Sequence, residues 1–226
     1  MPNNIGLLLT KRAAITPNKE AFVEWERERR FTFAQLNERT NRIASVLVER
    51  GIKPGDRVAT LLKNGIEFVE SYFAIAKIGA VMVPVNWRLV PAEISYILQD
   101  AGAGVLIYDA DFDDAVGQLQ SGERGVLPCR HWLRCYNHDS TPPEWAGNYD
   151  SLIAGASPAT ITEYVLRHVV STYVEWSNDL LTTEELRQVL KTHICLTLLG
   201  LTTGITKDRV TELLQNELSP ERRPPT

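Results

Sequence analysis

The chain has few cysteines and no long apolar run. Its 226 residues include three cysteines, Cys129, Cys135 and Cys195. This odd and sparse set favours a reducing compartment over a disulfide-linked scaffold. No stretch reaches the roughly 20 apolar residues that a membrane-spanning helix needs. The amino-terminal segment places its charges after a short apolar stretch, which is the reverse of the order in a secretory signal. We therefore expect a cytoplasmic protein without a transmembrane segment.

The chain also lacks a concentration of positive charge. Its formal net charge is −4, and 23% of its residues are charged. Proteins that bind nucleic acids usually have a concentrated basic face, so we expect no nucleic-acid partner. The hydrophobic fraction of 44% is typical of globular proteins. A chain of this length can form one large domain or two small ones, with a hydrophobic core.

Apolar segments of two kinds alternate between residues 58 and 108. Three continuous apolar runs predict strands at Val58–Leu62, Val81–Val85 and Val105–Tyr108. Between them, residues 64–78 and 91–101 place apolar side chains at helical spacing. Strands and helices that alternate with short connections predict a parallel sheet. Because the strands are continuously apolar, we expect helices on both faces of that sheet.

Further elements are expected on either side of this α/β core. The elements predicted before it are a helix at 5–15, strands at 21–25 and 30–33, and a helix at 34–50; those predicted after it are a helix at 111–119, a strand at 132–136 and a helix at 149–154.

The pattern changes near residue 158. Residues 157–160 have the composition of a linker, and from there to residue 219 the apolar residues follow helical spacing only. Thr182-Thr-Glu-Glu185 has the pattern of a capping box, which begins a helix. We therefore predict an α/β region at 1–158, a separate all-α segment of about three helices at 159–219, and a disordered tail at 220–226.

Three segments of the α/β region match one known enzyme family. They are Phe31-Thr-Phe-Ala-Gln-Leu36, Gly51-Ile-Lys-Pro-Gly-Asp-Arg-Val58 and Ala76-Lys-Ile-Gly-Ala-Val-Met-Val-Pro-Val-Asn-Trp-Arg-Leu89. With these segments in this order, residues 5–152 resemble the N-terminal part of AMP-forming fatty-acyl-CoA synthetases of the adenylating enzyme superfamily. The resemblance implies a partial N-terminal subdomain with a parallel sheet and flanking helices.

The resemblance also implies a reaction, in which ATP activates a fatty acid to an acyl-adenylate and the acyl group passes to coenzyme A. Such chemistry needs a phosphate-binding loop, an aspartate for the ribose, an acid or base network with Mg²⁺, and a mobile lysine that neutralises pyrophosphate. In the family nearly all of these lie downstream of the matched region. ATP, Mg²⁺, coenzyme A and the fatty acid are thus implied by the resemblance alone. We expect a truncated or hybrid member that is inactive alone, with no catalytic residue and no metal ligand identified.

One later segment superficially resembles the family's phosphate loop. Thr202, Thr203, Gly204 and Lys207 supply hydroxyl groups, a flexible glycine and a cation, which are what a phosphate cradle requires. Asp208 follows at once and would repel phosphate. The segment also follows two predicted helices instead of a strand, so a turn between helices is the alternative interpretation.

Two other groups of residues suggest metal ligands. Cys129, His131, Cys135 and His138 lie within ten residues, but their spacing matches no common zinc motif. A loop with incidental cysteines is the alternative.

The second group is acidic. Asp109, Asp111, Asp113 and Asp114 could hold a hard cation, but the glycine and the distal glutamate of a calcium loop are absent. A solvated helix start is the alternative.

A second class of function stays open. A partial adenylating domain would leave apolar surface uncovered, and exposed apolar patches drive association. The helical segment at 159–219 could cover that surface or pair between chains, and it loosely resembles the C-terminal half of TetR-type regulators. This alternative is a non-catalytic binding or dimerisation protein, whose partner is a second copy or a complementing chain.

Overall fold

The computed structural model describes residues 4–122, 126–135, 141–158, 161 and 164. Nearly all of them belong to the first of two compact units, Met1–Ser157. Apart from Ile161 and Tyr164, the predicted helical segment at 159–219 and the tail at 220–226 lie outside the described residues, and they stay predictions. Within the described part of the chain, no helix is long and apolar enough to cross a membrane.

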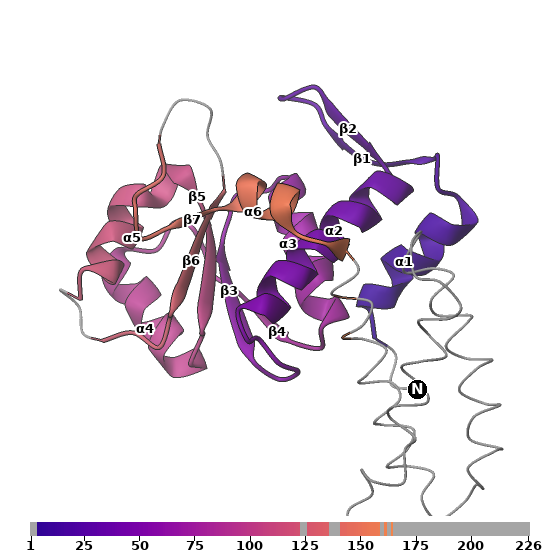
Figure 1. The fold of residues 1–226 in the computed structure, drawn as a ribbon. Helices are drawn as coiled ribbons and strands as arrows, with labels where there is room; N and C mark the ends of the chain where they lie inside the picture. Colours follow the sequence, from indigo (N-terminus) through magenta and orange to yellow (C-terminus); the bar gives the residue numbers. More distant parts are fainter. Residues whose placement is uncertain (1–3, 123–125, 136–140, 159–160, 162–163, 165–226) are drawn as a thin grey trace, which may run out of the picture. The chain divides into compact units, whose positions relative to one another are not determined.

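A five-stranded parallel sheet forms the centre of the first unit (Figure 1), and its strand order is β4–β3–β5–β6–β7. The predicted parallel α/β core is therefore confirmed. The short β7 escapes prediction because its two residues, glycine and asparagine, are depleted in strands. The strands are β3 (Arg57–Leu61), β4 (Val81–Pro84), β5 (Val105–Asp109), β6 (His131–Cys135) and β7 (Gly147–Asn148).

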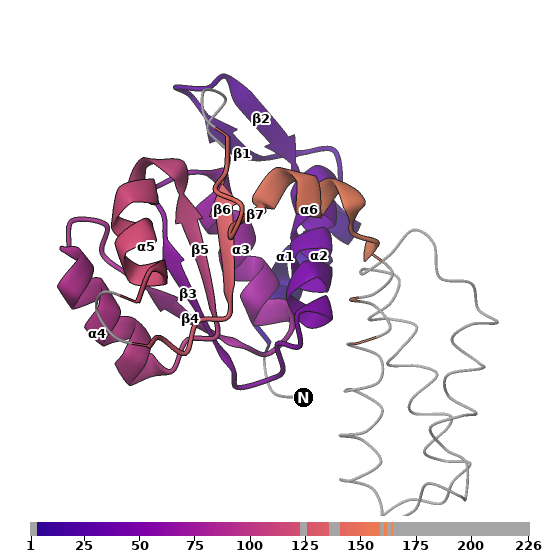
Figure 2. The same ribbon diagram turned by 60° about the vertical axis from the view of Figure 1, so that its left-hand side comes forward.

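Helices cover both faces of the sheet, as continuously apolar strands require. On one side lie α2 and α3, with α1 packed against both, and on the other side lie α4 and α5 (Figures 1 and 2). The short α6 follows β7 and packs against α2. Each helix predicted between residues 5 and 154 is present. The helices are α1 (Gly6–Ile15), α2 (Phe33–Glu49), α3 (Ile66–Lys77), α4 (Pro91–Ala101), α5 (Asp113–Gln120) and α6 (Tyr149–Gly155), with a 3₁₀ turn at Ala110–Phe112.

A separate antiparallel hairpin, formed by β1 (Glu20–Glu24) and β2 (Arg29–Thr32), stands near one end of the sheet (Figure 2). Its last residue, Thr32, begins α2 through a capping box. The Thr32 hydroxyl accepts from the Gln35 backbone N–H at 3.3 Å, and the Gln35 side chain accepts from the Thr32 N–H at 2.9 Å. The hairpin is therefore continuous with the start of α2.

An apolar cluster lies between the sheet and the layer of α4 and α5. Leu106 and Tyr108 of β5 belong to it and are fully buried, as is Leu98 of α4. Because side chains alternate across a strand, the intervening Val105 and Ile107 point toward the opposite layer, and they are also fully buried. The central strand β5 is thus buried on both faces, which explains its unbroken apolar sequence.

The burial of β5 gives a direct test of this core. We expect Leu106→Ala to lower the free energy of unfolding by about 2–5 kcal/mol, because it removes buried methyl groups and leaves a cavity. The matched control is Leu8→Ala, since Leu8 on α1 is 58% exposed, and its expected effect is within about 0.5 kcal/mol. Urea unfolding followed by circular dichroism measures both; equal effects would contradict the central position of β5.

Candidate functional site

The carboxyl ends of β3 and β5 form the candidate site. From β3 the chain passes through α3 to β4 on one side, and from β4 it returns through α4 to β5 on the other side of β3. The winding direction therefore reverses between β3 and β5. In open parallel sheets, ligands bind outside the carboxyl ends of the strands at such a switch point. Seven charged residues gather here, and we call them the carboxyl-edge cluster: Glu24, Arg27, Arg29, Lys63, Glu67, Asp109 and Asp111.

Lys63 joins the ends of the two central strands. It follows β3, and its backbone N–H donates to Asp109 Oδ2 at 2.6 Å. Its side-chain Nζ lies 2.5 Å from Asp111 Oδ2, and both partners of this ion pair are 49% exposed. The ammonium group also lies 5.9 Å from the ring centroids of Trp87 and Phe112, within the range of cation–π attraction. The carboxylate of Asp111 and two aromatic rings thus lie beside one accessible cation.

Asp109 is the most perturbed acid of the cluster. Burial raises the pKa of its carboxyl group to about 6, and the nearby Glu67 and Asp111 act in the same direction. The hydrogen bond from Lys63 and the positive charge of Arg27 oppose the rise. A carboxyl group that titrates near pH 6 is a common feature of functional sites, although structural charge networks produce it too.

The hairpin contributes the other half of the cluster. Arg29 of β2 donates to Glu24 at 2.5 Å and to Glu67 of α3 at 2.8 Å, so it connects β1, β2 and α3. Gly65 lies just before α3, and a Cβ there would be 3.1 Å from a Glu67 oxygen and 3.2 Å from a Glu24 oxygen, so both side chains would have to shift slightly. The more exposed Arg27 lies 3.7 Å from Glu67 and 4.0 Å from Glu24.

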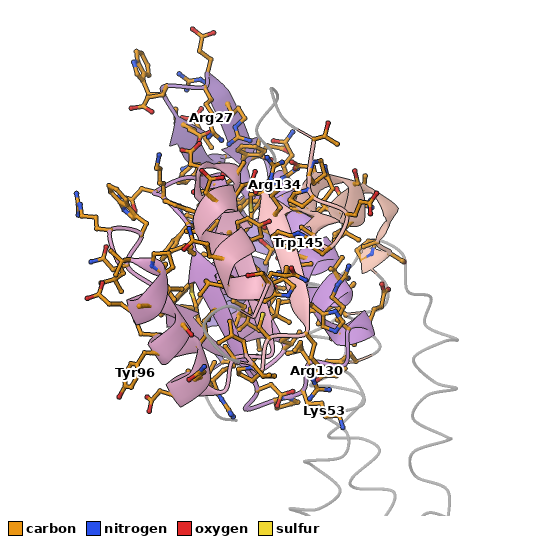
Figure 3. All side chains as sticks on the ribbon, turned by 90° about the vertical axis from the view of Figure 1, so that its left-hand side faces the viewer. Arg27, Lys53, Tyr96, Arg130, Arg134 and Trp145 are labelled. Carbon is orange, nitrogen blue, oxygen red and sulfur yellow. The ribbon has the colours of Figure 1, made fainter. Side chains whose placement is uncertain are left out.

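Two further ion pairs lie beside the cluster. The buried Arg134 of β6 binds both carboxylate oxygens of Asp113 at 2.7–2.9 Å, in the two-point geometry that suits a guanidinium. Arg39 of α2 pairs with the fully buried Glu70 of α3. Burial raises the pKa of Glu70, which the adjacent guanidinium opposes. Figure 3 shows Arg27 and Arg134 toward the same end of the sheet, with Lys53 and Arg130 at the other.

The charges of this edge are therefore largely matched in pairs. Lys63, Arg29 and Arg134 each contact carboxylates. An anionic ligand would reach Lys63 and Arg27 with the least rearrangement, because their side chains are 49% and 58% exposed. The geometry favours a structural role over direct binding of a polyanion, because the ion pairs join the hairpin to α3, α2 to α3, and α5 to β6.

The structure separates the cysteines of the suggested zinc group. Cys129 precedes β6 and Cys135 ends it, so a whole strand lies between the two thiols. Cys129 Sγ donates to the His131 carbonyl at 3.4 Å, and burial raises the pKa of the Cys129 thiol to about 12. His138 lies outside the described residues. Among those that are described, no three histidine, cysteine or acidic side chains form a group that could hold a metal.

The aspartate group is dispersed among basic partners. Asp109 accepts from the Lys63 backbone, Asp111 pairs with the Lys63 side chain, and Asp113 pairs with Arg134. Asp113 and Asp114 lie in the first turn of α5, where negative charge is favourable. Their clustering in sequence is thus explained by a helix start and by ion pairs.

The residues of the suggested phosphate loop cannot be placed in this site. Thr202, Thr203, Gly204 and Lys207 lie outside the described residues. They remain a sequence prediction.

Comparison with known proteins now identifies the family. The model of the family described as "AMP-binding enzyme" matches residues 9–162, which is more than half of the chain. The chain belongs to the AMP-binding enzyme family. The long-chain-fatty-acid–CoA ligase FadD13 of Mycobacterium tuberculosis is 48% identical over 107 residues, which cover 47% of this chain and 21% of the ligase. The crotonobetaine/carnitine–CoA ligase of Citrobacter koseri is 35% identical over 161 residues, or 70% of this chain and 30% of that one.

A solved structure agrees with these sequence matches. The Mycobacterium tuberculosis fatty acyl CoA synthetase superimposes with a TM-score of 0.61 at 34% identity, over 69% of this chain and 29% of that one. The resemblance to the N-terminal part of fatty-acyl-CoA synthetases is thereby confirmed. The chain spans between about a fifth and a third of the length of these relatives.

The sequence pattern indicates Asp109 and Asp111 only as possible cation ligands and does not indicate the other five residues of the carboxyl-edge cluster. A signal was present, because Lys63 and Asp109 are charged residues at or just past the ends of apolar strands, where parallel sheets place functional groups. The contributions of Arg29 and Glu67 depend on how the hairpin packs against α3, which no local sequence pattern specifies.

The raised pKa of Asp109 predicts a pH-dependent effect of Asp109→Asn. The folded chain disfavours the charged carboxylate of Asp109. The stability of the fold with respect to this group is therefore greatest below the ordinary pKa of 3.8, and it is lost as the pH rises through about 6. The free energy of unfolding of Asp109→Asn, measured relative to that of the wild type, should therefore be higher at pH 7.5 than at pH 4.5.

Urea unfolding at the two pH values measures this difference. The exposed Asp111→Asn is the matched control, and it should show a smaller change with pH. If the free energy of unfolding of Asp109→Asn differs from that of the wild type by the same amount at both pH values, the burial of a charged carboxylate at this position is contradicted.

Proposed function

We propose that the chain is a truncated or hybrid N-terminal part of a fatty acid–CoA ligase and forms no acyl-CoA alone. The observation that supports this most directly is the family match over residues 9–162 to ligases of which the chain spans about a fifth to a third. In the complete family reaction, ATP, Mg²⁺ and coenzyme A are co-substrates or cofactors, and the acid is a fatty acid. For this chain the first unit would supply scaffold.

The charge balance at the carboxyl edge supports a scaffold role. Adenylation requires donors or cations directed at phosphate groups, and these must not already be neutralised by carboxylates. Within the described part of the chain, Arg29, Lys63 and Arg134 at this edge pair with acids. The described acids do not fit Mg²⁺ either, because Asp111 and Asp113 are paired with cations and no group of three potential ligands is formed.

Calorimetry on the purified chain tests the proposal. We expect no saturable binding of ATP–Mg²⁺, and no acyl-CoA formation from palmitate, ATP and coenzyme A. The control is Lys207→Ala, which should behave as the wild type does. Saturable binding that this variant loses would contradict the proposal and would assign a phosphate site to residues 202–207.

A complementing chain is the partner that this proposal implies. FadD13 without the 107-residue matched segment would be mixed with the purified chain, and acyl-CoA formation would be measured. Activity of the mixture, absent from either part and from a mixture with heat-denatured chain, would support complementation. If no mixture is active, complementation is contradicted, and the chain has no catalytic role.

A second candidate is a non-catalytic binding or dimerisation protein that uses the helical segment at 159–219. What favours it is exposed apolar surface on the first unit. Leu8 and Ile15 of α1 are exposed, as is Ile5 just before the helix. A further exposed group lies on β4, α4 and the loop between them: Val81, Trp87, Val90 and Tyr96. Contiguous exposed apolar surface is a frequent mark of association.

Light scattering over a range of concentrations distinguishes the two candidates. Pairing between chains predicts a mass that rises from that of a 25.4 kDa monomer toward twice that value as the concentration increases. Removal of residues 159–226 should then abolish the rise. A monodisperse monomer at every concentration would contradict dimerisation.

A further inference from the structure

Lys77 is a buried lysine at the junction of three helices. It is the last residue of α3, and only 2% of its surface is exposed. Its Nζ donates to Asn37 Oδ1 at 2.7 Å and to Asn41 Oδ1 at 2.6 Å, both on α2. The Asn37 oxygen also accepts from the Thr10 hydroxyl of α1 at 3.1 Å. One amine therefore connects α3 to α2 directly and to α1 through a shared acceptor.

The same residue contacts α1 through its backbone. Gly6 packs so closely that a Cβ at this position would lie 2.5 Å from the Lys77 nitrogen and 2.8 Å from its Cα. Asn4, just before the helix, donates to the Lys77 carbonyl at 3.4 Å. The start of α1 is thus held against Lys77 through close backbone packing as well as through side-chain hydrogen bonds.

The neighbours of the Lys77 amine carry no opposite charge in the described part of the chain. From α2 it meets Asn37 and Asn41. On α1, Gly6 packs against the backbone and Cγ of Lys77, and Thr10 shares the Asn37 acceptor; none of these four residues ionises. On α3 itself, Glu70 lies about two turns away and is paired with Arg39. Burial therefore lowers the pKa of Lys77 to about 7.

We propose that Lys77 makes the docking of α1 on α2 and α3 depend on pH, with the neutral amine favouring the docked helix and the charged amine loosening it. An ammonium group in this position keeps its hydrogen bonds to the amide oxygens but loses the hydration that it has in water. Undocking of α1 would allow water to reach the Lys77 ammonium group again. The central sheet does not have to open for this.

The direction of the pH dependence of docking follows from the pKa of Lys77 in the docked and the undocked state. Docked, Lys77 titrates near 7, and exposed to water it titrates near its ordinary 10.5. Between these values the docked state binds fewer protons, so docking gains stability as the pH rises through this window, by up to about tenfold in its equilibrium constant for each pH unit. Below about pH 7 both states are charged, and docking is then at its weakest.

Hydrogen exchange of the α1 amides measures docking on the full chain. After correction for intrinsic exchange rates, protection of α1 should rise by about tenfold between pH 7.0 and 8.5, whereas protection of β5 amides should change less. In Lys77→Met the rise should disappear. The control Lys11→Met removes an exposed lysine from α1 and should keep the rise.

A second variant keeps the lysine and guards against misfolding of Lys77→Met. Asn41→Asp places a carboxylate beside the amine, which should raise the pKa of Lys77 and remove most of the rise in α1 protection between pH 7.0 and 8.5. Loss of the rise in either substituted chain, with Lys11→Met unchanged, supports the proposal. A rise that persists in both Lys77→Met and Asn41→Asp, or that is absent from the wild type, overturns it.

Discussion

The parallel pairing of β3 with β5 is the interaction on which the rest of the first unit depends. It brings Val58 beside Val105 and Leu61 beside Tyr108, although these residues are far apart in the sequence. Because β4 lies on the outer side of β3, the same pairing creates the switch point and places Lys63 next to Asp109. The hairpin then reaches this edge through Arg29 and Glu67. Core, switch point and charge cluster therefore share one origin.

Much of this fold follows from the sequence because its signals are local. Pro91 and Gly102 begin and end α4 where their backbone preferences predict, with Gly102 at φ +62°. The continuous apolar runs predict the parallel strands correctly; β3 and β5 are buried, whereas the edge strand β4 is partly exposed. The order of the strands does not follow in the same way, because it depends on which apolar faces meet, and β7 has no periodicity that could reveal it.

In contrast to the fold, little of the candidate site follows from local sequence signals. Its charged residues are visible in the sequence, but their meaning depends on partners at long range. Asp113 is predicted as a helix start or a cation ligand, and the structure pairs it with Arg134. Lys77 gives no signal at all, since a lysine at the end of a helix usually points to water. Only the packing of α1 over it makes it a buried group.

Cys129 and Cys135 have a consequence for chemical labelling. Both thiols are buried, and burial raises the pKa of each, so in the folded first unit the reactive thiolate is scarce and shielded. A thiol reagent reaches Cys135 only when β6 separates from its neighbours. The alkylation rate of Cys135 therefore measures how often β6 separates from the neighbouring strands of the central sheet.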